Sequence, residues 1–386
     1  MHVAARRLVL LALTACAQPS LPTAPRPRAA AAEPAPQIAS AIAAGRARLQ
    51  ALVAAEPIAG LQVAVALRGT IVWSEGFGFA DLATRRVVEP RTTFRAASVS
   101  KVITVGLLAV LVQAGKLDLD APIGHYLPKL PAHLAPITAR QLAGHLAGVR
   151  HYTSADGVRR VDERHFATVT DSLANFQDDP LVTPPGAKYA YSSYGFVLLS
   201  AVLEAAAGAP FLDALAAQVL APLGMRDTGP DDVTRIRPAR TVLYQRSDAG
   251  TLVDADATDP SSKWAGGGML TTSEDLVRFA SGHVHGGPLA APAIAATLFT
   301  SQIDGDGKPT GVGIGWRIAD GDRRHFHHAG AMDGARSIVL VYPDAQLAIA
   351  ILSNTTGRPG PIHELAIDLA APFLDPPNPA GAVPGR

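Results

Sequence analysis

The sequence predicts an α+β protein in which one antiparallel β-sheet, built from strands near both ends of the chain, is flanked by helices. β-rich runs occur within residues 61–79 and again within residues 312–353, whereas the pattern from about 118 to 259 is mostly helical with long loops. A single sheet made from both ends, with an inserted helical lobe at about 118–259, satisfies this order. We therefore expect one folded domain over residues 37–375.

A helix, a hairpin of two strands and a second helix are expected in the first third of this domain. Residues 37–55 place apolar side chains on one helical stripe. Leu61–Leu67 and Thr70–Phe79 are separated by Arg68-Gly69, which is typical of a hairpin. The helix that begins near Ser98 is apolar on all sides, so it should lie buried at the centre of the domain.

The rest of the chain gives helix signals and then strands. Thr138 begins a capping-box sequence, and Gly195–Ala207 has the pattern of an apolar helix. A glycine turn at 264–269 leads to a helix capped by Thr272 or Ser273. The expected C-terminal strands and final helix are Val312–Ile318, Arg324–His328, Arg336–Val341, Leu347–Ser353 and 361–373.

The N-terminus has the features of a secretory signal. A short apolar run ends in Leu13-Thr14-Ala15-Cys16, which is similar to a bacterial lipobox. Cys16 is the only cysteine, which excludes an internal disulfide and fits acylation of its thiol. We expect a lipoprotein-type signal at 1–16, a Pro/Ala-rich tether at 17–36 and a disordered tail at 376–386. The chain would be secreted and lipid-anchored, in the outer membrane facing the periplasm. A plain signal peptide with an incidental cysteine is the alternative.

Composition excludes one class of partner. The chain has 386 residues, of which 17% are charged, and a net charge of +1. Without a basic run there is no electrostatic footprint for nucleic acid. The composition leaves the oligomeric state open.

Ser98 and Lys101 are the first candidate catalytic residues. Three residues apart on a helix, they lie on one face, one turn from each other. A serine hydroxyl is a poor nucleophile until a group accepts its proton, and the lysine can do so. Free N–H groups at a helix start can also bind the oxyanion.

Two further motifs follow in order, Tyr191-Ser192-Ser193 before an apolar helix and His328-Ala329-Gly330 after a strand. Together with Ser98 and Lys101, they resemble the serine β-lactamase and penicillin-binding-protein superfamily, in particular its class-C-like branch. The resemblance covers roughly residues 40 to 370 and implies a β-lactamase/transpeptidase-like fold. Within that branch, residues 194–200 look closest to the mitochondrial-type proteins.

The resemblance implies a role for each residue. Ser98 would be the acylated nucleophile, Lys101 its proton partner and Tyr191 a second proton partner, as general base or shuttle. His328 stands where the third motif holds a lysine or histidine. Gly330 would be small so that substrate can lie along the strand edge. The oxyanion hole would be the N–H groups of Ser98 and Ala331.

Charge should act on these groups. Lys101 and His328, if both are buried, should lower each other's pKa and that of Tyr191, which favours a neutral amine or a tyrosinate. The second motif departs from the family, because Ser193 stands where asparagine is usual. With His328 in place of a lysine, this favours esters or peptide-like amides over β-lactams. Anion binding that depends on His328 would weaken as pH rises through about 6.5.

The implied function is a serine hydrolase acting through an acyl-enzyme on a small ester, peptide or peptidoglycan-like substrate, with no cofactor. A non-catalytic scaffold on the same fold is the alternative. His325 and His327 share a strand face, but no carboxylate or third histidine follows at a useful spacing, so we expect no metal site.

Overall fold

The computed structural model describes residues 35–153, 159–160, 164–285, 287, 289, 291–357 and 362–374. All of these lie in one compact unit that begins at Ala35. The predicted signal peptide with Cys16, nearly all of the tether and the predicted C-terminal tail lie outside the described residues.

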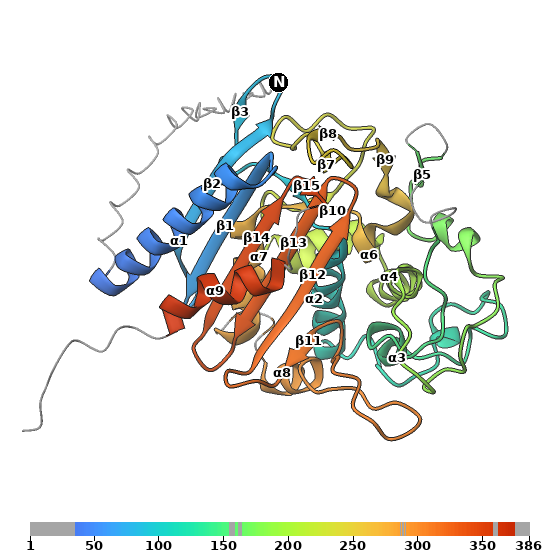
Figure 1. The fold of residues 1–386 in the computed structure, drawn as a ribbon. Coiled ribbons are helices and arrows are strands. Elements are labelled where there is room, and N and C mark those ends of the chain that lie inside the picture. The colour runs from blue at the N-terminus through green and yellow to red at the C-terminus, as the bar shows by residue number, and fades with distance from the viewer. Residues whose placement is uncertain are drawn as a thin grey trace, which may run out of the picture. The chain divides into compact units, whose positions relative to one another are not determined.

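A seven-stranded sheet combines the two ends of the domain, as predicted (Figure 1). Strand β1 runs antiparallel to β14, in register from Leu61 opposite Ser353 to Leu67 opposite Leu347. The turn between β1 and β2 has positive φ at Arg68 and Gly69, which is the hairpin geometry that the sequence indicated. In sheet order the strands are β11 (Arg317–Ala319), β12 (His325–Met332), β13 (Ala335–Tyr342), β14 (Leu347–Ser353), β1 (Gly60–Leu67), β2 (Thr70–Asp81) and β3 (Arg86–Val87).

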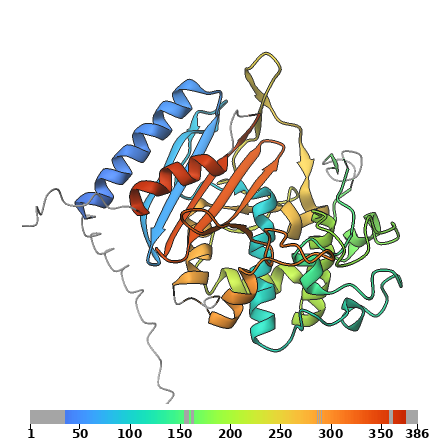
Figure 2. The same cartoon turned by 60° about the horizontal axis from the view of Figure 1, so that its bottom comes forward.

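Each face of this sheet covers its own apolar core. Helices α1 (Pro36–Ala55) and α9 (Ile362–Leu374) lie on one face, drawn in blue and red in Figures 1 and 2. The opposite face packs on α7 (Ser273–Val284) and, beyond it, on the larger core around α2 (Ser100–Gln113). Thr272 caps α7 by accepting a hydrogen bond from the Asp275 N–H.

The inserted region is less helical than predicted, because it also contains short strands. Thr138 forms the capping box that the sequence indicated. The helices and helical turns are Ile123–His125, α3 (Ala139–Ala143), Asp171–Asn175, α4 (Ser193–Ala207), α5 (Phe211–Leu215) and the π-helical Ala216–Leu220. The strands are β5 (Arg159–Arg160), β6 (Gly229–Pro230), β7 (Tyr244–Arg246), β8 (Leu252–Asp254) and β9 (Thr258–Asp259).

The remaining elements connect the inserted region to the sheet. They are β4 (Phe94–Arg95), the 3-10 turn Ala97–Val99, the 3-10 turn Pro260–Lys263, α6 (Trp264–Gly267), β10 (Met269–Thr271), α8 (Pro292–Leu298) and β15 (Thr355–Thr356). Within the described residues, no single helix has the length and apolarity to cross a bilayer. Helix α4 and the segment Phe211–Leu220 meet that test only as a pair, and they are bent by 74°.

The predicted strand Val312–Ile318 is mostly wrong. Only its end belongs to β11. Gly315 adopts φ +75°, which an L-residue in a strand does not take up. The Gly315 N–H donates to the Ala143 carbonyl and the Ile314 N–H to that of Leu298. The apolar run is therefore a buried turn, bonded to the helical side of the molecule.

Candidate active site

The predicted nucleophile lies in a tight turn between β4 and α2. Ala97 has φ +45°, an uncommon conformation for a residue with a Cβ, and Ser98 follows it in a 3-10 turn. Helix α2 begins at Ser100 and is almost entirely buried, as predicted. A strained residue before a half-buried serine is typical of a backbone held for a functional purpose.

Lys101 lies beneath Ser98 and is completely buried. Its Nζ is 3.4 Å from Ser98 Oγ and 2.8 Å from Ser193 Oγ, and it also donates to the Gly266 carbonyl. Burial removes water from the ammonium group and holds the pKa of Lys101 well below its usual value, and the charge of Arg317 lowers it further. The amine can therefore be neutral and accept a proton from Ser98.

Tyr191 reaches Ser98 from the other side. Its hydroxyl donates a 2.8 Å hydrogen bond to Ser98 Oγ. The pKa of Tyr191 is raised by burial, although the bond to Ser98 and the charge of Arg317 oppose the change. The sequence-based expectation of a lowered tyrosine pKa is therefore wrong, because burial outweighs the nearby cations. Of the two forms expected, the structure favours the neutral amine over the tyrosinate.

Ser193 is the second serine that contacts the Lys101 amine. It is the first residue of α4, whose N-cap Ser192 accepts a 2.8 Å hydrogen bond from the Gly195 N–H. The helix start thus points Ser193 Oγ at Lys101 Nζ. The serine that stands where asparagine is usual therefore uses its hydroxyl in a hydrogen bond to Lys101.

Strand β12 carries the third motif along the edge of the nucleophile turn. His328 is buried, and its Nδ1–H donates to the Ala329 carbonyl at 2.8 Å. Burial, Lys101 and Arg317 hold the pKa of His328 well below 6.5, so the ring is neutral near neutral pH. Strand β11 pairs only with residues up to His327, and from His328 onward no described strand covers that edge.

The structure gives a further reason why residue 330 must be small. A Cβ there would lie 2.7 Å from the Ala96 carbonyl oxygen and 2.8 Å from the Ser98 nitrogen, and it would also clash with Ser337 Oγ. The glycine therefore lets the nucleophile turn pack against β12. Ala331 is exposed next along the strand, opposite Arg336 of β13.

Two histidines of the inserted region shape the second motif, and no local sequence pattern marks their role. His145 Nδ1 accepts a hydrogen bond from the Ser192 N–H at 3.2 Å, and its ring lies 4.5 Å from that of Tyr191. His151 Nδ1 accepts from the Ser193 N–H at 3.0 Å. Both imidazoles therefore fix the backbone that presents Tyr191 and Ser193.

A second buried lysine, Lys263, directly precedes the glycine turn at 264–269, and no sequence pattern marked it. Its Nζ has no hydrogen-bond partner in the described part of the chain and lies 4.1 Å from the centre of the Tyr152 ring. Burial and the charge of Lys101 lower the pKa of Lys263 to about 7. Arg317, exposed on β11, was also missed, yet its charge lowers the pKa of Lys101 and His328.

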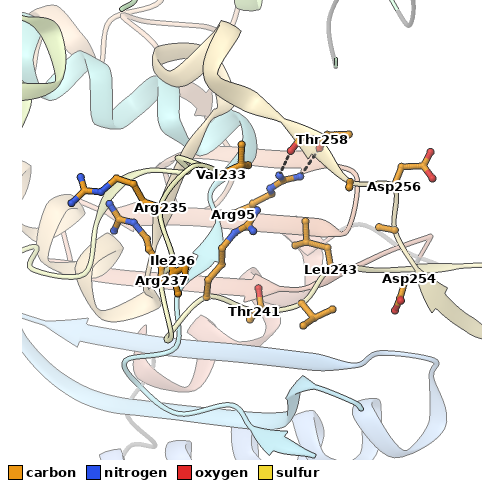
Figure 3. Close-up of a pocket in the computed structure, with 14 residues that line it drawn as sticks. Arg95, Val233, Arg235, Ile236, Arg237, Thr241, Leu243, Asp254, Asp256 and Thr258 are labelled. Carbon is orange, nitrogen blue, oxygen red and sulfur yellow. Dashed lines mark hydrogen bonds between the residues drawn. The ribbon is translucent and has the colours of Figure 1, made fainter. Parts of the chain in front are cut away.

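An open pocket of about 580 Å³ is lined by Arg95 and by residues of the segments 233–243 and 254–258 (Figure 3). Arg95 is buried, donates to Thr258 and forms a 2.6 Å ion pair with Asp231. Because Arg95 is three residues before Ser98, these bonds anchor the chain that leads into the nucleophile turn. None of the predicted site residues lines this pocket.

No third histidine follows His325 and His327 at a useful spacing along the sequence, but the fold supplies one. His363, from α9, lies beside them, and ligand atoms of the three side chains all lie within 4.8 Å of one another. The spacing along the sequence hid this residue, because α9 returns to the sheet only after β13 and β14.

A serine at the start of a buried helix, bonded to a lysine that burial can keep neutral and to a tyrosine, defines an acyl-transfer enzyme. Residues 46–371 match the Beta-lactamase family profile, and the chain belongs to this family. It is a serine hydrolase that acts through an acyl-enzyme on an ester or amide, and the scaffold alternative is not favoured.

Similar proteins cover most of the chain. The mitochondrial serine beta-lactamase-like protein LACTB of Homo sapiens is 28% identical over 74% of this chain and 69% of its own length. Penicillin-binding protein 4 of Amycolatopsis lactamdurans is 30% identical over 80% of this chain and 84% of its own. The crystal structure of SurE has a TM-score of 0.74 and 27% identity, covering 91% of this chain and 80% of SurE.

Proposed function

We propose that this serine hydrolase cleaves small esters or peptide-like amides in preference to β-lactams. The observation that carries the proposal is the position of Ser193. Its hydroxyl bonds to Lys101 Nζ at 2.8 Å, and serine is too short to offer substrate the carboxamide that asparagine offers. Losing one polar contact to a substrate amide costs about 1–3 kcal/mol.

Relatives support the same choice of substrate. A D-aminopeptidase of Cereibacter sphaeroides is 26% identical over 82% of this chain and 60% of its own length. Esterase EstB of Burkholderia gladioli is 33% identical over 45% of this chain. Peptidoglycan-like peptides fit the same reaction class.

The proposed reaction begins at Ser98. Its Oγ attacks the substrate carbonyl carbon while its proton passes to the neutral amine of Lys101. The N–H groups of Ser98 and Ala331 would receive the developing oxyanion. Collapse of the intermediate expels the alcohol or amine, which takes a proton through the Tyr191 hydroxyl, and Tyr191 regains one from Lys101. Water then attacks the carbonyl carbon of the acyl-enzyme while its proton passes to Lys101. The bond from that carbon to Ser98 Oγ breaks, the carboxylic acid leaves, and Ser98 Oγ takes the proton back from Lys101.

Labelling with a fluorophosphonate, followed by intact-mass measurement, tests the nucleophile. The wild type and Ser100→Ala should gain one adduct, and Ser98→Ala none. Lys101→Ala should slow labelling by about 10²–10⁴-fold, the usual contribution of a general base. An adduct that persists in Ser98→Ala would overturn the assignment.

The substrate preference has its own measurement. We expect kcat/KM to be higher for a p-nitrophenyl ester or a D-amino acid anilide than for nitrocefin. Faster hydrolysis of nitrocefin would reject the preference, while labelling of Ser98 would leave the serine hydrolase intact.

We also propose that Cys16 carries a lipid that anchors the domain in the outer membrane, facing the periplasm. The support is the residue order at positions 13–16 and the proline-rich segment after it. Cell fractionation should find the wild type in the membrane fraction and Cys16→Ser in the soluble fraction. Equal membrane association of both proteins would contradict the anchor.

A further inference from the structure

Three histidines meet between β12 and α9, on the sheet face opposite Ser98. His325 and His327 alternate along β12, so both project towards the helix side, and His363 lies in the first turn of α9. His325 is buried and the other two are half-buried. The His327 and His363 rings stack with their centres 3.9 Å apart.

The separation of the nitrogens approaches that of a tetrahedral metal site. His325 Nε2 is 3.1 Å from His363 Nε2, and ligand atoms of all three residues lie within 4.8 Å of one another. Zinc–nitrogen bonds of about 2.0–2.1 Å place two ligand nitrogens about 3.3 Å apart. The closest pair already fits, and the widest separation closes when a half-buried ring turns about its side-chain torsions.

The protonation pattern leaves nitrogens available for a ligand. The Nδ1–H of His325 donates to the Arg323 carbonyl at 3.1 Å, which leaves the lone pair of Nε2 directed at His363. A backbone acceptor on the far nitrogen is the usual support of a metal-binding imidazole. His327 Nδ1 is buried without a hydrogen-bond partner in the described part of the chain. A polar atom in that state is costly unless something binds it.

We propose that His325, His327 and His363 bind one zinc-class divalent transition-metal ion. Three neutral imidazoles suit zinc, cobalt, nickel and copper, and disfavour magnesium and calcium, which take oxygen ligands. The proton that His363 Nε2 donates to His325 moves to its own Nδ1 through solvent, so the ring stays neutral. The fourth position is left to water.

The ion would join the C-terminal helix to the strand that borders the nucleophile. His328 directly follows His327, but it projects to the opposite face, so the metal does not reach the reacting atoms. Its role is structural: it should raise the thermal stability of the chain and leave the acylation chemistry to Ser98.

Cobalt titration of the full chain, made without a polyhistidine tag and stripped with a chelator, tests the proposal. We expect one equivalent of Co²⁺ to give a tetrahedral visible spectrum that one equivalent of Zn²⁺ abolishes. His363→Ala and the milder His363→Gln should each weaken binding at least about tenfold. Zinc should raise the Tm of the wild type and not that of either variant.

The matched control is His125→Ala, which removes an exposed histidine from the 3-10 turn of the inserted region. This variant keeps Cys16 and all three cluster histidines, so it should bind as the wild type does. Wild-type cobalt affinity in both His363 variants, or no binding by the wild type, would overturn the proposal. Neither outcome depends on which substrate the enzyme cleaves.

Discussion

The two faces of strand β12 carry the same residue type in different surroundings. Phe326, His328 and Gly330 face the core of α2 and the nucleophile turn, whereas His325, His327 and Ala329 project towards α9. On the first face a single neutral imidazole is fixed by a backbone carbonyl beside Lys101. On the second, imidazoles from two elements face one another.

This contrast shows how the alternation of a strand separates two chemistries that are adjacent in sequence. His327 and His328 are consecutive, yet they lie on opposite faces of the sheet. The first belongs to a cluster suited to a metal ion, and the second lies at the edge of the active site. The identity of a histidine therefore says little until the opposing elements are known. The predictions below test each side of the contrast.

The largest expected effect is that of Gly330→Ala on the nucleophile side. The added Cβ would lie within 2.8 Å of the Ser98 nitrogen, so the turn must move away from β12. Displacing one oxyanion donor costs about 10²–10³-fold in kcat. We expect a loss of that order in ester hydrolysis.

The matched control is Gly321→Ala, because a Cβ at that glycine has nothing within 4 Å. Its kcat and Tm should stay those of the wild type. Activity of Gly330→Ala within a few-fold of the wild type would show that the close packing of β12 on Ser98 is not needed.

How far the sequence predicts this molecule depends on the range of the interactions involved. Strand β14 was predicted at its observed bounds, Leu347–Ser353, because a continuous apolar run marks a buried strand locally. The proximity of Ser98 and Lys101 was predictable because the two residues are one helical turn apart. The position of His363 was not predictable, since no local pattern says which helix covers which sheet face. The raised pKa of Tyr191 was not predicted either, because its cause is burial, which depends on the whole fold.

A smaller effect concerns stability in acid. His283 of α7 lies against Phe299, which stacks on Phe326 of the nucleophile face of β12. Burial lowers its pKa to about 3, and it should be neutral for the same reason as His328. Because the folded pKa lies below the unfolded value of about 6.5, the unfolded chain binds the extra proton between these values. Stability therefore falls as pH falls through that window.

Between pH 7 and pH 5 this loss is about 2 kcal/mol, because the slope approaches 1.36 kcal/mol per pH unit below pH 6.5. Urea unfolding of the wild type and of His283→Leu at pH 7 and pH 5 checks it. The drop in unfolding free energy between the two pH values should be about 2 kcal/mol smaller in the variant. Equal drops would mean that burial does not keep this histidine neutral. Any repacking cost of leucine applies at both pH values and cancels.

The smallest effect is the handling of anionic substrates at the mouth of the site. The sequence suggested that His328 would supply a cation below pH 6.5, but its pKa lies well below that value. Arg317 is exposed on β11, and its positive charge acts on both Lys101 and His328. An exposed charge pair is worth about 1 kcal/mol, which corresponds to about fivefold in kcat/KM.

We therefore expect Arg317→Gln to lower kcat/KM about fivefold for a p-nitrophenyl ester with a carboxylate in its acyl chain. Hydrolysis of the uncharged analogue should change much less, because burial is the main cause of the low pKa of Lys101 and remains in place. The control Arg48→Gln removes the same charge from α1, on the far side of the sheet. It should leave kcat/KM unchanged for both esters. Lys263, whose pKa of about 7 falls inside the range, is first replaced by methionine. In that background the ratio of the two kcat/KM values should stay flat from pH 5.5 to 8.5, because an arginine side chain keeps its charge there and His328 stays neutral. A ratio that falls as pH rises through about 6.5, and that Arg317→Gln leaves intact, would return the anion-binding role to His328.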